Sequence, residues 1–189
     1  MRVNVPAEHQ LQPTAFVATH YAPDVVGPAF AYSKATYEHS RLSLREFEAA
    51  RARTAQINGC LLCQTWRSDR DTAAYLESLG SKADSVATRG GPAPDELFYD
   101  SVAEWKTAPL FSERERIAIE YAEGLGLDPH GIAGNEDFWR RAKAVYSDEE
   151  IVDLSYCIAC WMGLGRVAHA LGIDGICQIP ALARETTPA

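Results

Sequence analysis

The chain has 189 residues, of which 47% are hydrophobic and 23% are charged, a composition typical of a globular protein. Its formal net charge is -8, and the basic residues are interleaved with acidic ones. This pattern argues against a nucleic-acid-binding surface, because phosphate binding needs clustered Lys and Arg, so we expect no nucleic-acid partner.

The sequence also lacks signals for membrane insertion or export. Residues 1–6 do not have the apolar core of a signal peptide. No stretch approaches the roughly 18 uninterrupted apolar residues that a membrane-spanning helix needs. We therefore expect a soluble, cytoplasmic protein without a membrane partner, in a compartment where thiols are normally kept reduced.

The first half of the chain predicts three helices. One spans residues 23–39. A second, at residues 43–58, opens with Ser-Leu-Arg-Glu, a capping-box pattern in which a serine and a glutamate satisfy each other's free backbone amides, and an Asn-Gly pair ends it. A third follows Cys60 as far as residue 79. Residues 80–94 are rich in Gly, Ser and Pro and lack an apolar period, so they predict an exposed loop.

The second half predicts three more helices. Capping-box sequences open helices at residues 112–126 and 147–171, where apolar residues recur every three or four positions until a glycine ends the pattern. Another helix spans residues 136–145. Alternating Val, Ile and Thr runs typical of strands are nearly absent. The sequence therefore predicts an all-α protein with more than half of its residues in helices.

We expect a single domain over residues 1–189. The loop at residues 80–94 connects a first half, about residues 14–80, to a second half, about residues 95–175, and does not separate independent cores. In each half a capping-box helix leads to a Cys-x-x-Cys pair. The halves therefore predict a weak internal helical repeat in which one copy is active.

Five cysteines form two Cys-x-x-Cys pairs and leave Cys177 alone. In a cytosolic protein such a pair indicates redox or metal chemistry. Cys60 and Cys63 follow a helix end and are the candidate redox pair; a zinc half-site is less favoured, because structural zinc needs four ligands. Cys157 and Cys160 lie within an apolar run, where free cysteine packs as a small hydrophobic residue. We expect no metal and no cofactor.

The setting of the first pair favours a thiolate. The Asn-Gly turn closes one helix and Cys60 opens the next, so free backbone amides and the helix dipole act on the sulfur. Arg67, four residues after Cys63, adds a positive charge on the same predicted helix face. Glu48 lies on the preceding helix. Arg67 and Glu48 are either solvated surface residues or members of a site with the two cysteines.

The spacing of these residues resembles a known motif. In the carboxymuconolactone decarboxylase and AhpD-like alkylhydroperoxidase family, a Glu precedes a Cys-x-x-Cys pair by twelve residues, and a His follows the second Cys by four. Glu48, Cys60 and Cys63 match this spacing, and the Asn-Gly turn also resembles that of the family. Residues 112–130 and 146–173 resemble the longer, peroxidase-related branch, so the resemblance covers nearly the whole chain from about residue 14.

The resemblance implies a fold and a reaction. The fold is an AhpD-like helical bundle, typically oligomeric, so we expect a homo-oligomer. In the reaction, Cys63 attacks a hydroperoxide, Cys60 resolves the sulfenic acid as an internal disulfide, and a dithiol donor reduces that disulfide. The helix-end position alone slightly favours Cys60 as the attacking sulfur, because it is nearer the end of the dipole.

One residue departs from the family motif. Arg67 stands where the family has the His that relays a proton from the Glu to the second cysteine. Arginine stays charged at any working pH and cannot relay a proton, although it can stabilise a thiolate and could pair with Glu48. His169, on the apolar side of the last predicted helix, is predicted to be a core residue. It is also the best candidate to replace the missing relay.

The leading functional prediction is a thiol peroxidase or disulfide oxidoreductase that depends on Cys60 and Cys63. One alternative is a decarboxylase-like, non-redox enzyme, because the same family fold also hosts lactone decarboxylation. Another is a non-catalytic redox sensor, which would oxidise once and not turn over. The expected partners of the leading function are a hydroperoxide or other small-molecule substrate and a dithiol electron donor.

Overall fold

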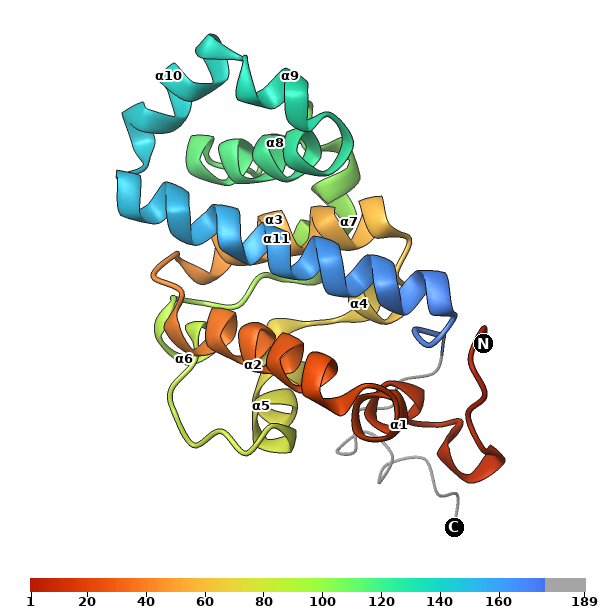
Figure 1. The fold of residues 1–189 in the computed structure, drawn as a ribbon. Helices are drawn as coiled ribbons and strands as arrows, with labels where there is room; N and C mark the ends of the chain where they lie inside the picture. Colours follow the sequence, from red (N-terminus) through yellow and green to blue (C-terminus); the bar gives the residue numbers. More distant parts are fainter. Residues whose placement is uncertain (176–189) are drawn as a thin grey trace.

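The computed structural model describes residues 1–175, and helices make up 72% of them, with no strand in this part of the chain. The predicted all-α class is confirmed (Figure 1). The helices are α1 (Pro13–His20), α2 (Pro23–His39), α3 (Leu44–Asn58), α4 (Leu61–Thr65), α5 (Ser68–Ser78), α6 (Val86–Arg89), α7 (Glu96–Ser101), α8 (Glu113–Leu127), α9 (Pro129–Ala133), α10 (Glu136–Val145) and α11 (Asp148–Leu171), with 3-10 turns at Ala7–His9 and Val102–Glu104.

The three predicted capping boxes all form, at the starts of α3, α8 and α11. In each, the serine side chain accepts a hydrogen bond from the backbone N–H of the glutamate three residues later, and that glutamate accepts one from the serine N–H. α3 ends at Gly59 with φ 68°, and α11 ends at Gly172 with φ 64°. Glycine adopts this left-handed conformation without a steric cost, so the predicted ends of both helices are confirmed.

The helix predicted after Cys60 is wrong in one respect, because it is split into α4 and α5. Trp66 and Arg67 between them are extended. In an unbroken helix the Arg67 amide would donate to the carbonyl of Cys63. The Arg51 side chain donates to that carbonyl instead, at 2.7 Å, and the Arg67 amide donates to the Asp71 carboxylate at 2.8 Å. A side chain on α3 therefore breaks the helix.

The predicted loop at residues 80–94 is also partly wrong, because it contains α6. This four-residue helix opens with a small capping box between Ser85 and Thr88. The short helices α1, α7 and α9 were not predicted from the sequence either. Helices of four to eight residues complete only one or two turns, which is too short for an apolar period to be recognised.

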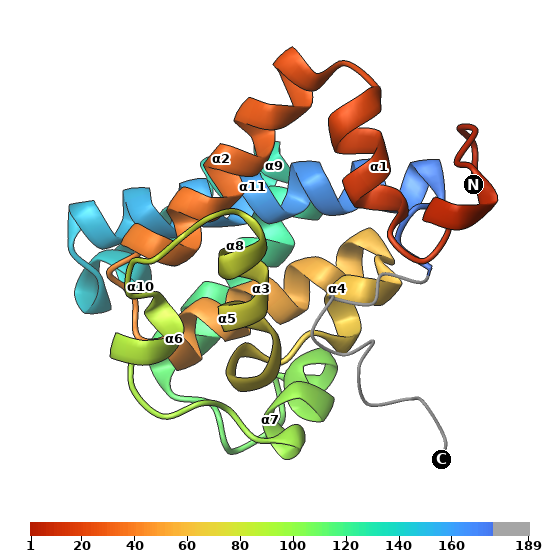
Figure 2. The same cartoon turned by 90° about the horizontal axis from the view of Figure 1, so that it is seen from below.

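α3 lies at the centre of the bundle, packed against α8, α11 and α4 (Figures 1 and 2). α11 also contacts α2 and α8. Phe47 of α3 is fully buried and meets Trp161 of α11 edge to face, with ring centroids 4.6 Å apart. The larger hydrophobic cluster includes Phe47 from the first half and Phe138 from the second, so both halves contribute to it.

Among the described residues, α11 is the one helix long and apolar enough to cross a membrane, judged by length and composition alone. It has 24 residues, an 18-residue stretch within it has a mean hydropathy of 1.3, and its first turn carries three acidic residues. In the structure it packs against α2, α3 and α8. A core helix of a soluble protein passes the same test, so α11 is weak evidence for a membrane protein.

Candidate redox site

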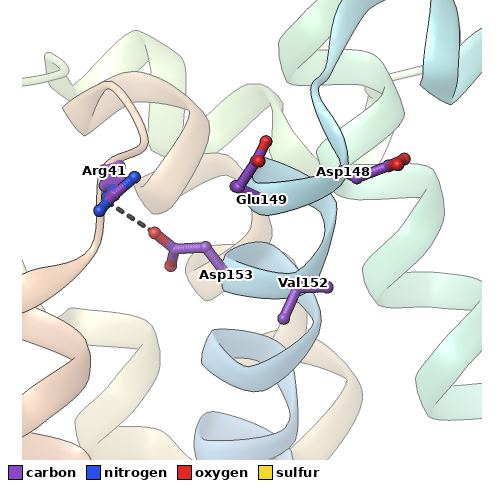
Figure 3. A pocket seen from close by; sticks show the side chains of 5 residues that line it. All are labelled: Arg41, Asp148, Glu149, Val152 and Asp153. Carbon is purple, nitrogen blue, oxygen red and sulfur yellow. Dashed lines mark hydrogen bonds between the residues drawn. The ribbon is translucent and has the colours of Figure 1, made fainter.

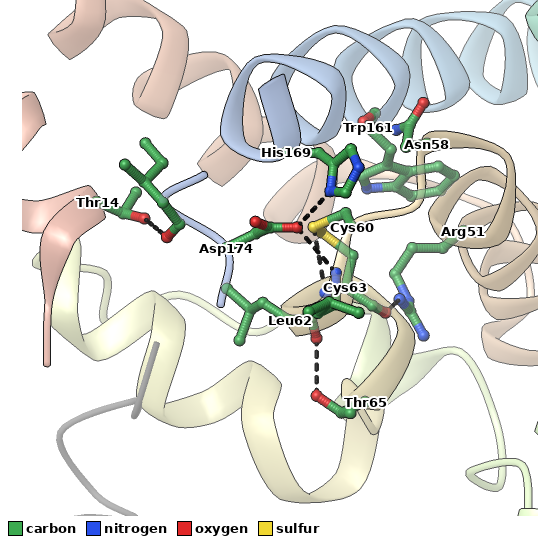
Figure 4. Close-up of a disulfide and its surroundings, with 12 residues drawn as sticks. Thr14, Arg51, Asn58, Cys60, Leu62, Cys63, Thr65, Trp161, His169 and Asp174 are labelled. Atoms are coloured by element: carbon green, nitrogen blue, oxygen red, sulfur yellow. Dashed lines mark hydrogen bonds and ion pairs between the residues drawn. A yellow bond between two sulfur atoms is a disulfide. The ribbon is translucent and has the colours of Figure 1, made fainter. Parts of the chain in front are cut away.

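Cys60 and Cys63 are joined by a disulfide, with their Cα atoms 5.3 Å apart (Figure 4). Cys60 is the N-cap residue of α4, and its Sγ accepts a hydrogen bond of 3.4 Å from the backbone N–H of Cys63. Cys60 is fully buried, whereas Cys63 is partly exposed. Because α4 has only five residues, the helix dipole at this pair is that of a single turn and is weaker than the sequence predicted.

Glu48 is fully buried on α3, and both of its carboxylate oxygens are engaged. Arg51 donates to Oε1 and to Oε2, each at 2.8 Å, and the Tyr99 hydroxyl donates to Oε2 at 2.8 Å. Arg51 also donates to the main-chain carbonyls of Cys63, at 2.7 Å, and Trp66, at 3.3 Å. Glu48 therefore connects to the cysteine pair through Arg51, which holds the backbone that carries Cys63.

The charges in this buried network reinforce one another. Burial would lower the pKa of Arg51, but the charge of Glu48 and its hydrogen bonds raise it above the ordinary value. Burial and the charge of Glu48 raise the pKa of Tyr99 to about 12. Arg51 therefore stays positive and Tyr99 stays a neutral hydrogen-bond donor at any physiological pH.

Arg67 does not pair with Glu48, a pairing that the sequence left possible. Its guanidinium pairs with the exposed carboxylate of Glu96 at 2.7 Å and stacks over the Tyr99 ring at 4.2 Å. Hydrogen bonds to Glu96 raise the pKa of Arg67. The break between α4 and α5 explains this placement, because Arg67 is no longer one turn of the same helix beyond Cys63.

A polar depression of about 240 Å³ lies between α3, α4 and α7, beside the cysteine pair. Arg67 and Tyr99 form part of its wall, and so does Gln64, the residue after Cys63. The remaining lining residues are Ala52, Gln56 and Asp100. A small polar molecule could therefore approach α4 from this side.

A second depression, of about 500 Å³, lies at the start of α11 (Figure 3). It is lined by Arg41, Asp148, Glu149, Val152 and Asp153, and the Arg41 backbone N–H donates to the Asp153 carboxylate at 2.6 Å. No cysteine or histidine lines it. It therefore offers neither a nucleophile nor a proton carrier with a near-neutral pKa, and we place the redox site at the cysteine pair.

His169 lies beside the disulfide and is not a core residue, so that prediction is wrong. Its side chain is 52% exposed, and its Nδ1 pairs with Oδ2 of the buried Asp174 at 2.9 Å (Figure 4). The same Asp174 oxygen accepts the backbone N–H of Leu61 at 3.0 Å. The ring lies against Gly59, where an added Cβ would come 3.2 Å from Nε2. His169 and Asp174 therefore flank the residues on either side of Cys60.

Three solved structures share this architecture. A protein of unknown function from Agrobacterium tumefaciens, with a proposed AhpD antioxidant-defence role, aligns with a TM-score of 0.60 at 19% identity over 91% of this chain and 95% of that one. An uncharacterized peroxidase-related protein from Ralstonia eutropha, with the alkylhydroperoxidase AhpD core, aligns at 0.58 and 20% identity over 91% and 90%. A peroxidase-related protein from Silicibacter aligns at 0.55 and 16% identity over 90% and 85%.

The fold is AhpD-like. The resemblance that the sequence predicted is thus confirmed at the level of the fold. No family model matches the chain. The uncharacterized Escherichia coli protein YnjA is 35% identical over 98 residues, which are 50% of this chain and 50% of that protein, so the match spans about half the length of this curated relative.

Within this AhpD-like bundle the second cysteine pair is part of the core. Cys157 and Cys160 are buried and free, as predicted, and the Cys157 thiol donates to Asp153 at 3.3 Å. Burial raises the pKa of Cys160 to about 11 and that of Cys157 further. Both therefore stay protonated at neutral pH, and Cys60 and Cys63 are the candidate redox pair among the described cysteines. Cys177 lies outside the described residues.

Three polar residues of the candidate site, Arg51, Tyr99 and Asp174, were not predicted from the sequence. Arg51 carried a local signal, because it lies three residues after Glu48 and therefore on the same helix face. Tyr99 is on α7, and Asp174 follows the end of α11. Neither has a local pattern that marks it, because each reaches the site only through the packing of distant helices.

Proposed function

We propose that this protein is a thiol peroxidase or disulfide oxidoreductase in which Cys60 and Cys63 alternate between dithiol and disulfide. The observation that carries this proposal is the linked pair itself, with a partly exposed Cys63, a buried Cys60 and a buried charge network that binds the Cys63 carbonyl. The peroxidase-related names of two proteins with the same fold support it.

The chemistry has an oxidative and a reductive half. The Cys63 thiolate attacks one oxygen of a hydroperoxide, the O–O bond breaks, and the departing oxygen takes up a proton and leaves as an alcohol or water. The Cys60 sulfur then attacks the sulfenic acid on Cys63, which releases water and forms the disulfide. A dithiol donor supplies two electrons and two protons to reopen it, becoming a disulfide itself.

We assign the attacking role to Cys63 for two reasons. The family resemblance assigns it to the second cysteine of the motif, and Cys63 is the more exposed of the pair. An incoming hydroperoxide and an incoming thiol both need access to a sulfur atom. The buried Cys60 is suited to resolve an oxidised neighbour, which needs no access from solvent.

The test is steady-state consumption of an alkyl hydroperoxide with dithiothreitol as the electron donor. We expect Cys63→Ser to abolish turnover. Cys60→Ser treated with hydroperoxide in the absence of dithiothreitol should be oxidised at Cys63 and stop at the sulfenic acid, because the resolving thiol is missing. Cys160→Ser is the matched control, because its thiol is buried and outside the site, and it should retain turnover. Wild-type turnover no faster than that of Cys63→Ser would overturn the proposal and favour a sensor or a non-redox enzyme.

The protein would work in the cytoplasm, where dithiol donors are available, and as a homo-oligomer. α11 presents Val152, Tyr156 and Val167 to solvent, each more than half exposed, and Val25 and Tyr32 of α2 are exposed as well. The Tyr32 hydroxyl donates to the Tyr156 carbonyl at 2.6 Å, which joins the two helices at this surface. We propose that a second copy of the chain covers this α2–α11 face, because it is apolar and lies opposite the core side of α11.

A further inference from the structure

His169 and Asp174 form a pair oriented toward the Cys60 end of the disulfide (Figure 4). His169 is in the last turn of α11, and Asp174 follows two residues after the glycine that ends that helix. The buried Asp174 carboxylate is held by the backbone N–H of Leu61, the residue after Cys60. The pair is therefore fixed to α4 on one side and to the end of α11 on the other.

The hydrogen bond to Asp174 determines which nitrogen of His169 is available. When Nδ1 carries the proton shared with the carboxylate, Nε2 is left as the nitrogen that can accept or donate another. The Nε2 edge of the ring is the one that lies against Gly59, the residue before Cys60. An aspartate that orients a histidine in this way also stabilises the imidazolium that forms when the ring takes up a proton.

The proposed reaction requires a proton to move at Cys60 in both halves. Cys60 must lose its proton to attack the sulfenic acid, and must take one up when the donor opens the disulfide. Its side chain is fully buried, so bulk water does not reach it directly. Glu48 has both oxygens engaged by Arg51 and Tyr99, and Arg67 is paired with Glu96 and cannot relay a proton.

Two other charged groups lie close to the end of α11 that carries His169. Arg166, on the same helix, donates to the Gly126 carbonyl at the end of α8. The amino terminus of the chain lies close to Gly172, where an added Cβ would come 3.6 Å from the Met1 nitrogen. Neither group is an anion. Among residues 1–175, Asp174 is the carboxylate paired with His169, and the imidazole is the candidate proton carrier beside Cys60.

We propose that His169, oriented by Asp174, transfers the proton of Cys60. In the oxidative half, Nε2 accepts the thiol proton as the Cys60 sulfur bonds to the Cys63 sulfur, the S–O bond of the sulfenic acid breaks, and the departing hydroxide takes up a proton from solvent and leaves as water. In the reductive half, a donor thiolate attacks the exposed Cys63 sulfur, the S–S bond breaks, and the imidazolium gives a proton to the departing Cys60 thiolate. The exposed side of the ring exchanges the proton with solvent. This inference rests on the proposed function, and it differs from the family relay, because His169 acts on Cys60 and is paired with Asp174 and not with Glu48.

The test measures the reductive step alone, so that it does not depend on hydroperoxide activity. The oxidised forms of wild type, His169→Gln and Asp174→Asn are mixed with dithiothreitol at pH values from 6 to 9.5. Samples are quenched in acid and alkylated, and the fraction of reduced protein is measured by mass spectrometry. We expect His169→Gln to be at least about tenfold slower at pH 6.5, because the general acid is lost. The two rates should converge at pH 9.5, where a neutral imidazole gives no help. Asp174→Asn should show the same trend with a smaller effect.

Two controls separate this role from a structural one. His39→Gln removes an imidazole that is 75% exposed on α2 and should match wild type at every pH. Thermal unfolding of each variant checks that the fold is retained. Equal rates of wild type and His169→Gln at pH 6.5 would overturn the inference, and so would a slowing that is the same at all pH values. If disulfide reduction slows in this pH-dependent way but the protein does not turn over hydroperoxide, the role of His169 stands and a hydroperoxide is not the oxidant.

Discussion

The buried Glu48–Arg51 pair ties the candidate site to α3. Both side chains are almost inaccessible to solvent, so each depends on the other for its charge to be tolerated. Arg51 also satisfies two main-chain carbonyls at the break between α4 and α5. Loss of one partner would leave a buried charge without compensation. Loss of both would leave the two carbonyls without a donor. The electrostatic cost would be much smaller than for a single loss, because no buried charge would remain unpaired.

A double-mutant cycle tests this dependence. We expect Arg51→Met to lower the free energy of unfolding by about 3–5 kcal/mol, because it strands the Glu48 carboxylate. Adding Glu48→Met should recover a large part of that loss. Urea unfolding measures both, with Arg67→Met as the control, whose exposed partner Glu96 should make its effect small. A double variant as unstable as the sum of the single variants would mean that the two side chains act independently.

At the scale of elements, helix ends bring the site together. α3 ends at Gly59, α4 begins at Cys60, and α11 ends close enough for His169 to contact that turn. The side-chain amide of Asn58 donates to the Trp161 carbonyl at 3.0 Å and so fastens the end of α3 to α11. An added Cβ at Gly165 would come 2.5 Å from the Asn58 Nδ2, so this close approach requires a glycine on α11.

Two glycines allow the contact with His169 to be tested apart from backbone strain. Gly59 and Gly80 have nearly the same left-handed φ, 68° and 69°, but an added Cβ meets His169 at Gly59 and open space at Gly80. Each Ala substitution should destabilise the fold by about 1–2 kcal/mol through the backbone. Only Gly59→Ala should also displace the ring and slow disulfide reduction at pH 6.5. If Gly80→Ala slows disulfide reduction as much as Gly59→Ala does, the contact with His169 is not the cause.

The buried thiols of α11 predict an alkaline limit of stability. The pKa of Cys160 is raised to about 11 in the folded protein, above the value near 8.5 of a free thiol. The protonated Cys160 thiol therefore contributes its full stabilisation of the folded state below about pH 8.5. This contribution is lost as pH rises toward 11, because the unfolded chain releases the thiol proton first. We expect the urea midpoint to fall between pH 9 and 11, and Cys160→Ala to weaken that fall. An unchanged slope in the variant would show that other groups, such as the buried tyrosines, cause it.

For the whole molecule, no described residue covers the side of α11 that carries Val152, Tyr156 and Val167. The helix packs on α3 and α8 through its buried residues, and Val152, Tyr156 and Val167 remain exposed. A long apolar helix of this kind is common at interfaces between copies of a chain. His169, which lies beside the cysteine pair, is in the last turn of the same helix. The proposed interface and the candidate site therefore share α11.

The proposed assembly is tested at Tyr156. We expect the wild-type protein to elute as an oligomer in size-exclusion chromatography with light scattering, and Tyr156→Glu to shift it to monomer by placing a charge in an apolar contact. Leu97→Glu on α7, at a side chain 64% exposed, is the control and should leave the mass unchanged. A monomeric wild type would reject this interface.

Several features of the protein were determined by the sequence itself. The capping boxes, the glycine ends of α3 and α11 and the absence of strand patterns are local signals, and each predicted what the structure contains. The Cys60–Cys63 spacing and the buried, unpaired state of Cys157 and Cys160 were also predictable, because they depend on a few neighbouring residues. Local hydrogen bonding and the apolar period are sufficient to specify features of this kind.

The tertiary structure decided which side chains meet. Glu48 pairs with Arg51 and not with Arg67, because α4 ends early and turns Arg67 toward Glu96. His169 reaches the turn before Cys60 although more than a hundred residues separate them in sequence, since α11 crosses α3 and ends beside it. Such contacts depend on how helices pack, and packing depends on side-chain shapes along whole elements. No pattern within a short segment records them.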